Sequence, residues 1–266
     1  YEMTSSLVGS EMCIRDRMNT PLFSIITVTY QAENTLPPTL KSVCGQTCTD
    51  FEYLIIDGAS TDKTVALAEA ARPVVSRIVS EPDRGIYDAM NKGVRLASGK
   101  YLIFLNAGDS FHSPDTLARL AEVACSCSPD ILYGDTAIVD ADRRFVGMRH
   151  LQAPDELQWR SFRNGMLVCH QAFVVRRQSA PEYDLQYRFS ADFDWCIRCM
   201  KQAQTLVHTR EILIDYLQEG MTTRHHRASL GERYRIMCRY YGTIPTLLRH
   251  IRFALRHLGR KLNRGK

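Results

Sequence analysis

Short runs of β-branched and apolar residues recur along the first half of the chain, and segments with helical periodicity separate them. The runs fall at residues 23–30, 53–56, 77–80, 101–105 and 130–133. Runs that are apolar at almost every position are typical of strands buried on both faces, as in parallel sheets covered by helices. The alternation therefore predicts an α/β fold with a doubly wound, mostly parallel, Rossmann-like sheet.

Local signals mark the helices between these runs. Pro37 and Pro38 suit the first turn of one helix, and Ser60 or Thr61 is expected to cap the next. Beyond about residue 140 the alternation breaks down, although residues 191–202 still indicate one clear helix. The regular part of the sheet is therefore expected in the first half of the chain.

Three segments are expected along the 266 residues. Residues 1–17 have no apolar core of a signal peptide and match nothing in the strand–helix pattern, so we expect a non-native leader. Residues 18–222 are expected to form the α/β domain. Residues 223–266 are expected to form a helical extension that is basic and amphipathic.

Three carboxylates follow three predicted strands. Asp57, Asp83 and Asp109 each stand where an apolar run ends. Ligands of doubly wound sheets bind at the carboxyl ends of the strands, so these side chains are expected to converge on one site. Each of them alone also suits a helix cap. Their mutual repulsion favours a site that holds a divalent cation together with a diphosphate.

The loop at residues 58–64 is rich in small polar side chains, as nucleotide-contacting loops often are. It lacks the glycine and lysine spacing of a P-loop, and no Gly-x-Gly-x-x-Gly follows the first predicted strand. These absences disfavour a P-loop nucleotidase and a dinucleotide-binding protein.

Three motifs carry a family resemblance. They are residues 24–30 (SIITVTY), 55–62 (IIDGASTD) and 102–109 (LIFLNAGD). Their order and intervals resemble the family 2 glycosyltransferases, which are inverting enzymes with the GT-A fold. The resemblance covers roughly residues 20–220 and implies a glycosyltransferase domain over residues 18–222.

The resemblance implies roles for matching residues. The donor-side residues are Thr29, Tyr30, Asp57, Ser60, Asp83, Arg84 and Asn106. Asp109 is expected to bind the divalent metal, Mn²⁺ or Mg²⁺, and Asp192 to be the catalytic base. Asp192 alternatively serves only as a favourable charge at a helix start.

One departure affects the metal site. The family often has Asp-x-Asp after the fourth strand, whereas residues 106–109 here read Asn-Ala-Gly-Asp. This pattern resembles a subgroup with Asn-x-Gly-Asp. It leaves one carboxylate, which suits a cation held mainly by phosphates and water.

The acceptor side is less well marked. His170 and Gln171 stand between apolar stretches and are expected to line an acceptor cleft, as are Asp194 and Trp195. His170 is equally well read as a structural histidine. His225 or His226 is a further candidate to reach the metal or the diphosphate.

The C-terminal segment carries much of the net charge of +5. Leucines and isoleucine from Leu247 to Leu262 share one helical face, and arginines from Arg249 to Arg260 share another. Such a helix suits an anionic membrane surface or packs on the domain with a solvated basic face. No base-reading motif accompanies the charge, so nucleic acid is not an expected partner.

The nine cysteines show no disulfide framework and favour reduced thiols in a cytoplasmic protein. The basic C-terminal helix adds the expectation of a peripheral location at the inner face of the membrane. We therefore expect an inverting glycosyltransferase that moves a sugar, most often from UDP in this family, to a glycan or lipid-linked acceptor in surface-polysaccharide synthesis. A sugar-nucleotide nucleotidyltransferase and a non-catalytic sugar-nucleotide-binding module are the alternatives. The sequence does not indicate the oligomeric state.

Overall fold

The computed structural model describes residues 20–218 and 226–264, and side-chain surroundings over 20–218 and 228–253. Within those residues nine strands form one sheet in the order β3-β2-β1-β4-β8-β6-β9-β5, with β7 paired to β6. The strands are β1 (Phe23–Thr29), β2 (Phe51–Asp57), β3 (Arg77–Ser80), β4 (Tyr101–Phe104), β5 (Ser110–Phe111), β6 (Ile131–Val139), β7 (Phe145–Met148), β8 (Phe173–Arg176) and β9 (Leu206–Leu217). The α-helices are α2 (Leu36–Cys44), α3 (Thr64–Ala70), α4 (Ile86–Leu96), α5 (Thr116–Cys127), α6 (Ala191–Gln202), α8 (His226–Tyr241) and α9 (Thr243–Arg264). Three 3₁₀ turns are η1 (Trp159–Asn164), η2 (His170–Ala172) and η3 (Arg177–Ser179).

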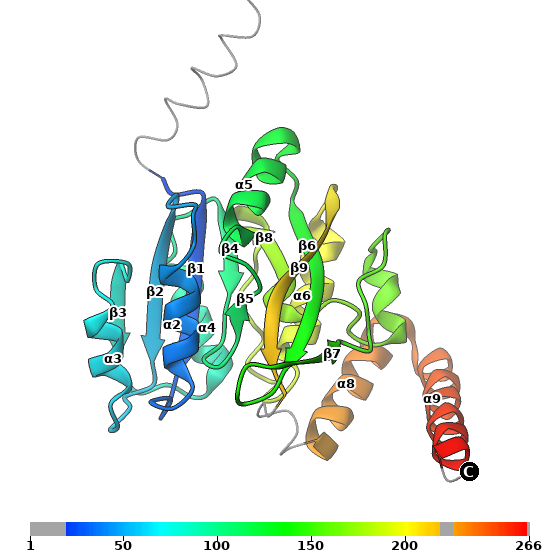
Figure 1. The fold of residues 1–266 in the computed structure, drawn as a ribbon. Coiled ribbons are helices and arrows are strands. Elements are labelled where there is room, and N and C mark those ends of the chain that lie inside the picture. Colours follow the sequence, from blue (N-terminus) through cyan, green and yellow to red (C-terminus); the bar gives the residue numbers. More distant parts are fainter. Residues whose placement is uncertain (1–19, 219–225, 265–266) are drawn as a thin grey trace, which may run out of the picture.

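The first four strands confirm the α/β prediction. β2 and β4 flank β1 and run parallel to it, and β3 runs parallel to β2. Every residue of β1 is buried, because α2 lies in front of this part of the sheet and α4 behind it (Figure 1). A strand covered on both faces needs apolar or hydrogen-bonded residues at every position, which is the pattern of residues 23–29.

The second half of the sheet is mixed in direction. β8 runs antiparallel to both β4 and β6, β9 runs parallel to β6, and β5 pairs antiparallel with β9. The parallel region predicted from the sequence therefore ends at β4. Because two antiparallel pairings separate β4 from β6, the carboxyl end of β9 returns to the same edge as that of β4.

The starts of three helices can be compared with the signals expected from the sequence. Two prolines begin α2, as expected. α3 begins at Thr64, with Lys63 at the N-cap position and no side-chain cap hydrogen bond, and the nearby Asp62 carboxylate accepts hydrogen bonds from Thr64 N (3.0 Å) and Thr64 Oγ1. Ser60 and Thr61 are therefore not the cap. α6 spans the predicted residues 191–202.

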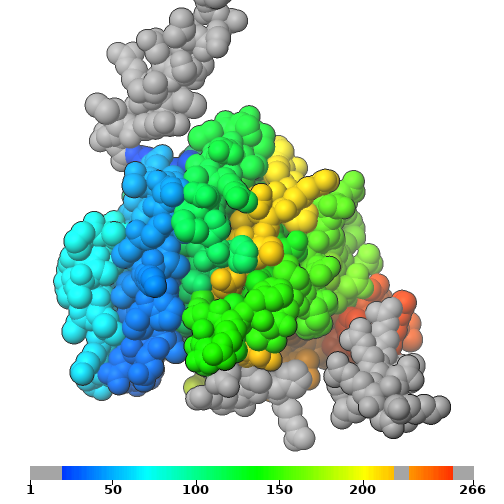
Figure 2. Space-filling model, viewed as in Figure 1, coloured from blue at the N-terminus to red at the C-terminus, as the bar shows by residue number. Residues whose placement is uncertain are grey.

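The C-terminal helices lie at the opposite end of the molecule from β3 (Figures 1 and 2). α8 and α9 meet at Gly242, whose φ of 86° is a left-handed conformation that glycine adopts without strain. In the parts of the chain that the structure describes, no helix is both long and apolar enough to cross a bilayer. Residues 1–17, His225 and the side chains of His226 and of the α9 residues beyond Phe253 lie outside the described residues.

Candidate active site

The carboxyl ends of β1, β2, β3 and β4 lie on one edge of the sheet, at the bottom of Figure 1. Asp57 is the last residue of β2, and Asp83 and Asp109 lie in the loops that follow β3 and β4. The edge is therefore where the fold gathers the predicted donor side, and each carboxylate there has a different environment.

Asp57 is hydrogen-bonded by side chains and backbone of the protein itself. It is 1% exposed and accepts hydrogen bonds from Thr29 Oγ1 (2.9 Å), Ser60 N (2.8 Å), Ser60 Oγ (2.5 Å) and Ser80 Oγ (2.7 Å). Burial raises the pKa of a carboxyl group, but here the hydrogen bonds from Ser60, Ser80 and Thr29 outweigh it, and the pKa of Asp57 is lowered. The carboxylate fixes the β2–α3 loop, and Thr29 and Ser60 take part in the same network.

An exposed aromatic side chain lies next to this network. Tyr30 is 68% exposed at the end of β1, which is unusual for a large aromatic side chain. A Cβ atom added to Gly58 would lie 2.5 Å from Asp83 Oδ2 and 3.4 Å from the Tyr30 ring. Asp83 and Tyr30 therefore flank Gly58, and the absence of a side chain at Gly58 is what lets the carboxylate approach.

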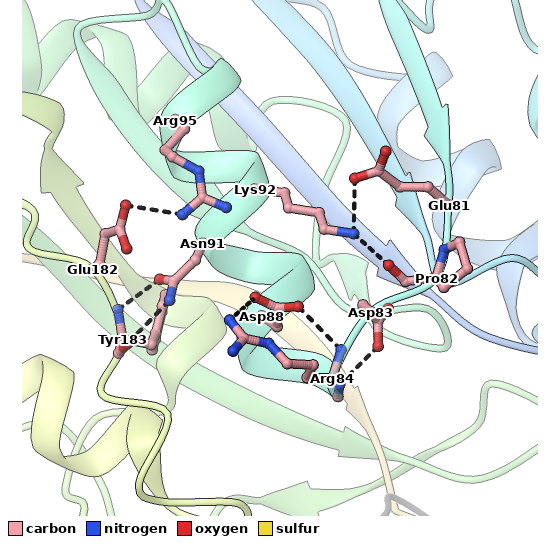
Figure 3. Close-up of polar contacts among 11 residues, drawn as sticks. Glu81, Pro82, Asp83, Arg84, Asp88, Asn91, Lys92, Arg95, Glu182 and Tyr183 are labelled. Atoms are coloured by element: carbon pink, nitrogen blue, oxygen red, sulfur yellow. Dashed lines mark hydrogen bonds and ion pairs between the residues drawn. The ribbon is translucent and has the colours of Figure 1, made fainter.

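The loop that carries Asp83 is held by α4 (Figure 3). Lys92 Nζ donates to the Pro82 carbonyl (2.8 Å) and pairs with Glu81 (2.9 Å). The Arg84 backbone N donates to Asp88 Oδ2 (3.0 Å), and Gly85 N donates to Asp83 Oδ1 (2.8 Å). These contacts fix the backbone and leave the Arg84 side chain exposed, paired weakly with Asp88 at 3.3 Å.

Asp109 lies in the loop after β4 and is 4% exposed. Its Oδ1 accepts from Leu217 N at the end of β9 (3.0 Å), and its Oδ2 accepts from Gln171 Nε2 (2.7 Å). Burial is the largest effect and raises the pKa of Asp109 to about 7, although Leu217, Gln171 and the charge of Arg143 act against it. The protein thus leaves this carboxylate short of positive charge.

The loop around Asp109 is rigidly supported. Thr39 Oγ1 on α2 donates to the Asp109 carbonyl (2.7 Å) and accepts from Gly108 N (3.0 Å). Arg143 donates to the Gly108 carbonyl (2.6 Å) and to Ser110 Oγ. Gly108 has a φ of 104°, a conformation that favours glycine at this position of the motif.

These residues fit a cation bound by few protein ligands. The Asn106 side-chain oxygen is buried without a hydrogen-bond partner in the described residues, and it lies in the same turn as Asp109. Among residues 20–218 and 228–253, no three His, Cys, Asp or Glu side chains gather as a metal cluster. Asp109 with Asn106 suits Mg²⁺ or Mn²⁺, which keep most of their ligands as phosphate oxygens and water.

Asp192 stands in the first turn of α6 and is partly exposed, whereas the residues on either side of it are buried. Its Oδ1 accepts from Tyr87 Oη (3.1 Å) and from Phe193 N (2.9 Å). Burial and the charge of Asp192 raise the pKa of Tyr87 well above its ordinary value, so Tyr87 remains a donor. Within the described residues nothing donates to Asp192 Oδ2, which leaves this oxygen able to accept a proton.

Asp109 and Asp192 act on the same buried thiol. Burial raises the pKa of Cys169 to about 11, the charge of Arg149 opposes this, and the charges of Asp109 and Asp192 both add to it. Burial is the largest cause of the raised pKa of Tyr216, and the charges of the same two carboxylates add to it. Asp109 and Asp192 therefore both lie near Cys169, which directly precedes the turn η2.

His170 and Gln171 form that turn and are buried. His170 Nε2 is 2.7 Å from Tyr183 Oη, and burial lowers the pKa of His170 to about 4, so the imidazole is neutral. Gln171 contacts Asp109 rather than an open cleft. The histidine fits the structural reading, and the glutamine orients the carboxylate of Asp109.

Asp194 and Trp195 are fully buried. Asp194 pairs with Arg198 (2.6 Å) and accepts from Tyr240 Oη (2.8 Å), while Trp195 packs among Phe104, Phe173 and Tyr183. Neither side chain has surface with which to contact an acceptor, so the acceptor-side prediction for these two residues is corrected. Asp192 faces outward because it is two positions earlier on the helix.

Several residues of the site had no signal in the sequence. Tyr87 holds Asp192, Thr39 and Arg143 support the Asp109 loop, and Gln171 orients Asp109. Each is separated from its partners by at least 33 positions in the chain, so no spacing rule connects them. Only Gln171 was singled out, and for a different role.

Comparison with known proteins identifies the family. Residues 24–183 match the family model described as Glycosyl transferase family 2. The chain belongs to glycosyltransferase family 2. A PGL/p-HBAD biosynthesis glycosyltransferase of Mycobacterium tuberculosis is 38% identical over 204 residues, covering 74% of this chain and 77% of the relative. The putative teichuronic acid biosynthesis glycosyltransferase TuaG of Bacillus subtilis is 25% identical over 200 residues, covering 74% of this chain and 79% of the relative.

Solved structures agree on the fold of this family 2 glycosyltransferase. Residues 1–349 of TarS from S. aureus in complex with UDP-GlcNAc align with a TM-score of 0.65 and 19% identity, covering 81% of this chain and 64% of that chain. A mannosyltransferase from Pyrobaculum calidifontis in complex with GDP-Man and Mn²⁺ aligns with a TM-score of 0.61 and 13% identity, covering 92% and 81%. At these identities the likeness shows the fold, which is the GT-A type.

Proposed function

We propose that this glycosyltransferase moves a sugar from UDP to a hydroxyl of a cell-envelope glycan or lipid-linked acceptor. The observation that carries the proposal is the pair Asp109 and Asp192. Both border the region around Cys169, and neither forms an ion pair among the described residues. One carboxylate suits a cation and the other suits proton transfer.

The donor side supports a nucleotide ligand. Tyr30 offers an exposed ring for the nucleobase, and Asp83 beside it offers hydrogen-bond acceptors for the nucleoside. Arg84 supplies an exposed guanidinium for the phosphates. Asp57 and Ser60 act on the nucleotide through the loop that they fix. The complex of TarS with UDP-GlcNAc supports UDP as the first nucleotide to test.

The chemistry follows from the two carboxylates. Asp192 Oδ2 accepts the proton of the acceptor hydroxyl while Tyr87 and Phe193 N hold Oδ1. The acceptor oxygen bonds to the anomeric carbon from the face opposite the diphosphate, the bond to the diphosphate oxygen breaks, and the configuration inverts. Asp109 and Asn106 would hold a divalent cation, which would neutralise charge on the diphosphate leaving group.

The names of the relatives support the class of acceptor. The mycobacterial relative takes part in PGL/p-HBAD biosynthesis, and TuaG is named for teichuronic acid biosynthesis. These products belong to the cell envelope, so we place the acceptor among envelope glycans or their lipid-linked precursors. We place the enzyme on the cytoplasmic side of the membrane, peripherally bound.

Asp192→Asn tests the proposal. It should lower transfer of labelled sugar from UDP-sugars to envelope lipid extracts by about 10²- to 10⁴-fold, because a general base acts in the transition state. UDP affinity in the presence of Mn²⁺, measured by calorimetry, should stay within about twofold of wild type. Asp155→Asn, the same change at an exposed carboxylate, is the control. Near wild-type turnover in Asp192→Asn would remove Asp192 from the role of base.

The same assay separates the alternatives. A nucleotidyltransferase would release pyrophosphate from a nucleoside triphosphate rather than UDP from a UDP-sugar. A non-catalytic binding module would bind UDP-sugars and neither transfer nor hydrolyse them. Release of UDP by the wild-type protein, lost in Asp192→Asn, distinguishes the transferase from both.

A further inference from the structure

A cavity of about 300 Å³ opens between η1, α8 and α9. Helices α8 and α9 lie at the opposite end of the molecule from β3 (Figure 1). Three guanidinium groups line it, from Arg163 on η1 and from Arg249 and Arg252 on α9. Apolar side chains of α8 and α9, among them Met237, Tyr241 and Leu248, form the rest of its wall. None of these residues belongs to the candidate active site, so the cavity needs an explanation of its own.

The charge of the cavity is uncompensated. No carboxylate lines it, and across the described residues none of the three arginines forms an ion pair. Arg163 donates to the Arg160 carbonyl (3.0 Å) and Arg249 to Asn164 Oδ1, and both acceptors are neutral. Like charges around one small cavity repel, and a bound anion relieves the repulsion. Arginine is the side chain best suited to phosphate, because its N–H groups donate in pairs.

A buried polar group points to the same conclusion. Thr246 lines the cavity in the first turns of α9, and its Oγ1 is buried with no hydrogen-bond partner among the described residues. The amino end of a helix of this length carries partial positive charge and favours an anion. The cavity therefore joins three cations, a helix start and an unused hydroxyl.

The rim of the cavity is apolar and exposed. Leu248 lines the cavity and is 63% exposed, and Ile244, one turn earlier on α9, is 74% exposed. Leu247 and Ile251 are further exposed large apolar residues of this helix. Contiguous exposed apolar side chains beside basic ones are typical of helices that lie in the interface of an anionic membrane. A water-soluble anion would gain nothing from this rim, whereas a lipid would.

We propose that the cavity binds the phosphate headgroup of an anionic membrane lipid, with Ile244, Leu248 and Ile251 entering the headgroup region. The arginines bind the phosphate oxygens, and the apolar rim contacts the acyl boundary. This inference deepens the peripheral membrane location in the proposed function. Vesicle binding needs neither donor nor acceptor, so its failure and the failure of sugar transfer are separate results.

The test is co-sedimentation of the full chain with vesicles of phosphatidylcholine alone and with added phosphatidic acid or phosphatidylglycerol at equal surface charge. Arg252→Ala is the main variant, because Arg252 is exposed and makes no contact that supports the fold among the described residues. Arg249→Ala is the second variant. The matched control is Arg235→Ala, an exposed arginine of α8 outside the cavity. Each cavity variant should weaken binding to phosphatidic acid vesicles about fivefold, the effect of one basic residue at such a surface.

The outcomes decide between three explanations. A smaller loss in Arg235→Ala than in Arg252→Ala, with wild-type binding strongest on phosphatidic acid, supports the cavity. Equal losses in the cavity variants and the control overturn it in favour of diffuse surface charge. Equal wild-type binding to neutral and anionic vesicles also overturns it. Binding of inorganic phosphate without any vesicle binding would reassign the cavity to a soluble anion. Release of UDP from UDP-sugars should be unchanged in Arg252→Ala.

Discussion

Asp57 ends β2 and Asp109 lies in the loop after β4, the two strands that flank β1, and both carboxylates are buried, yet their pKa values move in opposite directions. Four donors surround Asp57, and hydrogen bonding lowers its pKa in spite of burial. Two donors reach Asp109, and burial raises its pKa to about 7. The number of donors thus separates a carboxylate whose charge the protein stabilises from one that the proposed cation would stabilise.

The two carboxylates therefore have different roles at this edge of the sheet. At the end of β2, Asp57 is hydrogen-bonded within the protein and shapes the loop over residues 58–64. The β4 end keeps a carboxylate whose negative charge the protein does not neutralise. A ligand that brings positive charge is therefore expected at Asp109 and not at Asp57, although the two residues look alike in the sequence.

The largest expected effect is that of Asp109→Asn on transfer. Removing the carboxylate should remove metal-dependent UDP binding and lower transfer roughly 10³-fold or more, because a Lewis-acid cation contributes several kcal/mol to the barrier. Calorimetry of UDP with Mn²⁺ and with EDTA, alongside the transfer assay, measures both effects. Equal UDP affinity with Mn²⁺ and EDTA in the wild type would contradict the assignment of the cation to Asp109.

The next effect is on stability and depends on pH. Without a cation, Asp109 has a pKa of about 7 in the folded state, against roughly 3.9 in an unfolded chain. Between these values the folded state holds the extra proton, so stability should fall as pH rises from about 4 to 7, and stay level above that. The loss attributable to Asp109 has a ceiling of about 4 kcal/mol.

Urea unfolding in EDTA at a series of pH values measures this dependence. The difference between the wild type and Asp109→Asn isolates the contribution of Asp109, because the other titrating groups are common to both proteins. The wild type should lose stability relative to the variant as pH rises through the window. If the difference does not change with pH, Asp109 is not the uncompensated group described here.

The contribution of Asp57 to stability, measured as the difference between the wild type and Asp57→Asn, should show the opposite dependence on pH. The folded pKa of Asp57 is lowered, so its stabilising effect is present above the unfolded value of roughly 3.9 and is lost as pH falls through the folded value. At neutral pH the variant should lose about 2 to 3 kcal/mol, since the amide leaves a buried donor without its acceptor. Ser80→Ala, which removes one donor of the same network, should lose about 1 kcal/mol.

Much of the parallel half was predictable because its signals are local. β1, β2 and β4 are each apolar at consecutive positions, and their carboxyl ends carry the motif residues. The directions of β8, β6 and β9 were not predictable, because pairing partners are distant in the chain and periodicity does not encode direction. The start of α3 was misplaced for a related reason, since Ser60 is bound to Asp57 and the helix begins only at Thr64.

The candidate site also contains residues that were predictable from local motifs and contacts that were not. The motif resemblance singled out Asp109 and Asp192, but the donors that distinguish Asp57 from Asp109 come from Thr29, Ser80, Gln171 and Leu217, which only the folded chain brings together. Asp192 and Asp194 are two residues apart on one helix, and only packing shows which of them is buried. Helix α6 turns about 200° between those positions, so one side chain faces the core and the other the site.

The smallest expected effect concerns Gly58, which lies between the two regions. A Cβ atom there would lie 2.5 Å from Asp83 Oδ2, so Gly58→Ala must displace the carboxylate. The clash is with the end of a flexible side chain, so the melting temperature should change little. If Asp83 contacts the nucleoside, the KM for the UDP-sugar should rise between about twofold and tenfold, the range of one hydrogen bond, with kcat unchanged. Gly231→Ala is the control, because nothing lies within 4 Å of a Cβ added there. An unchanged KM in a folded Gly58→Ala protein would remove Asp83 from the donor side and leave Tyr30 as the remaining contact at this edge of the sheet.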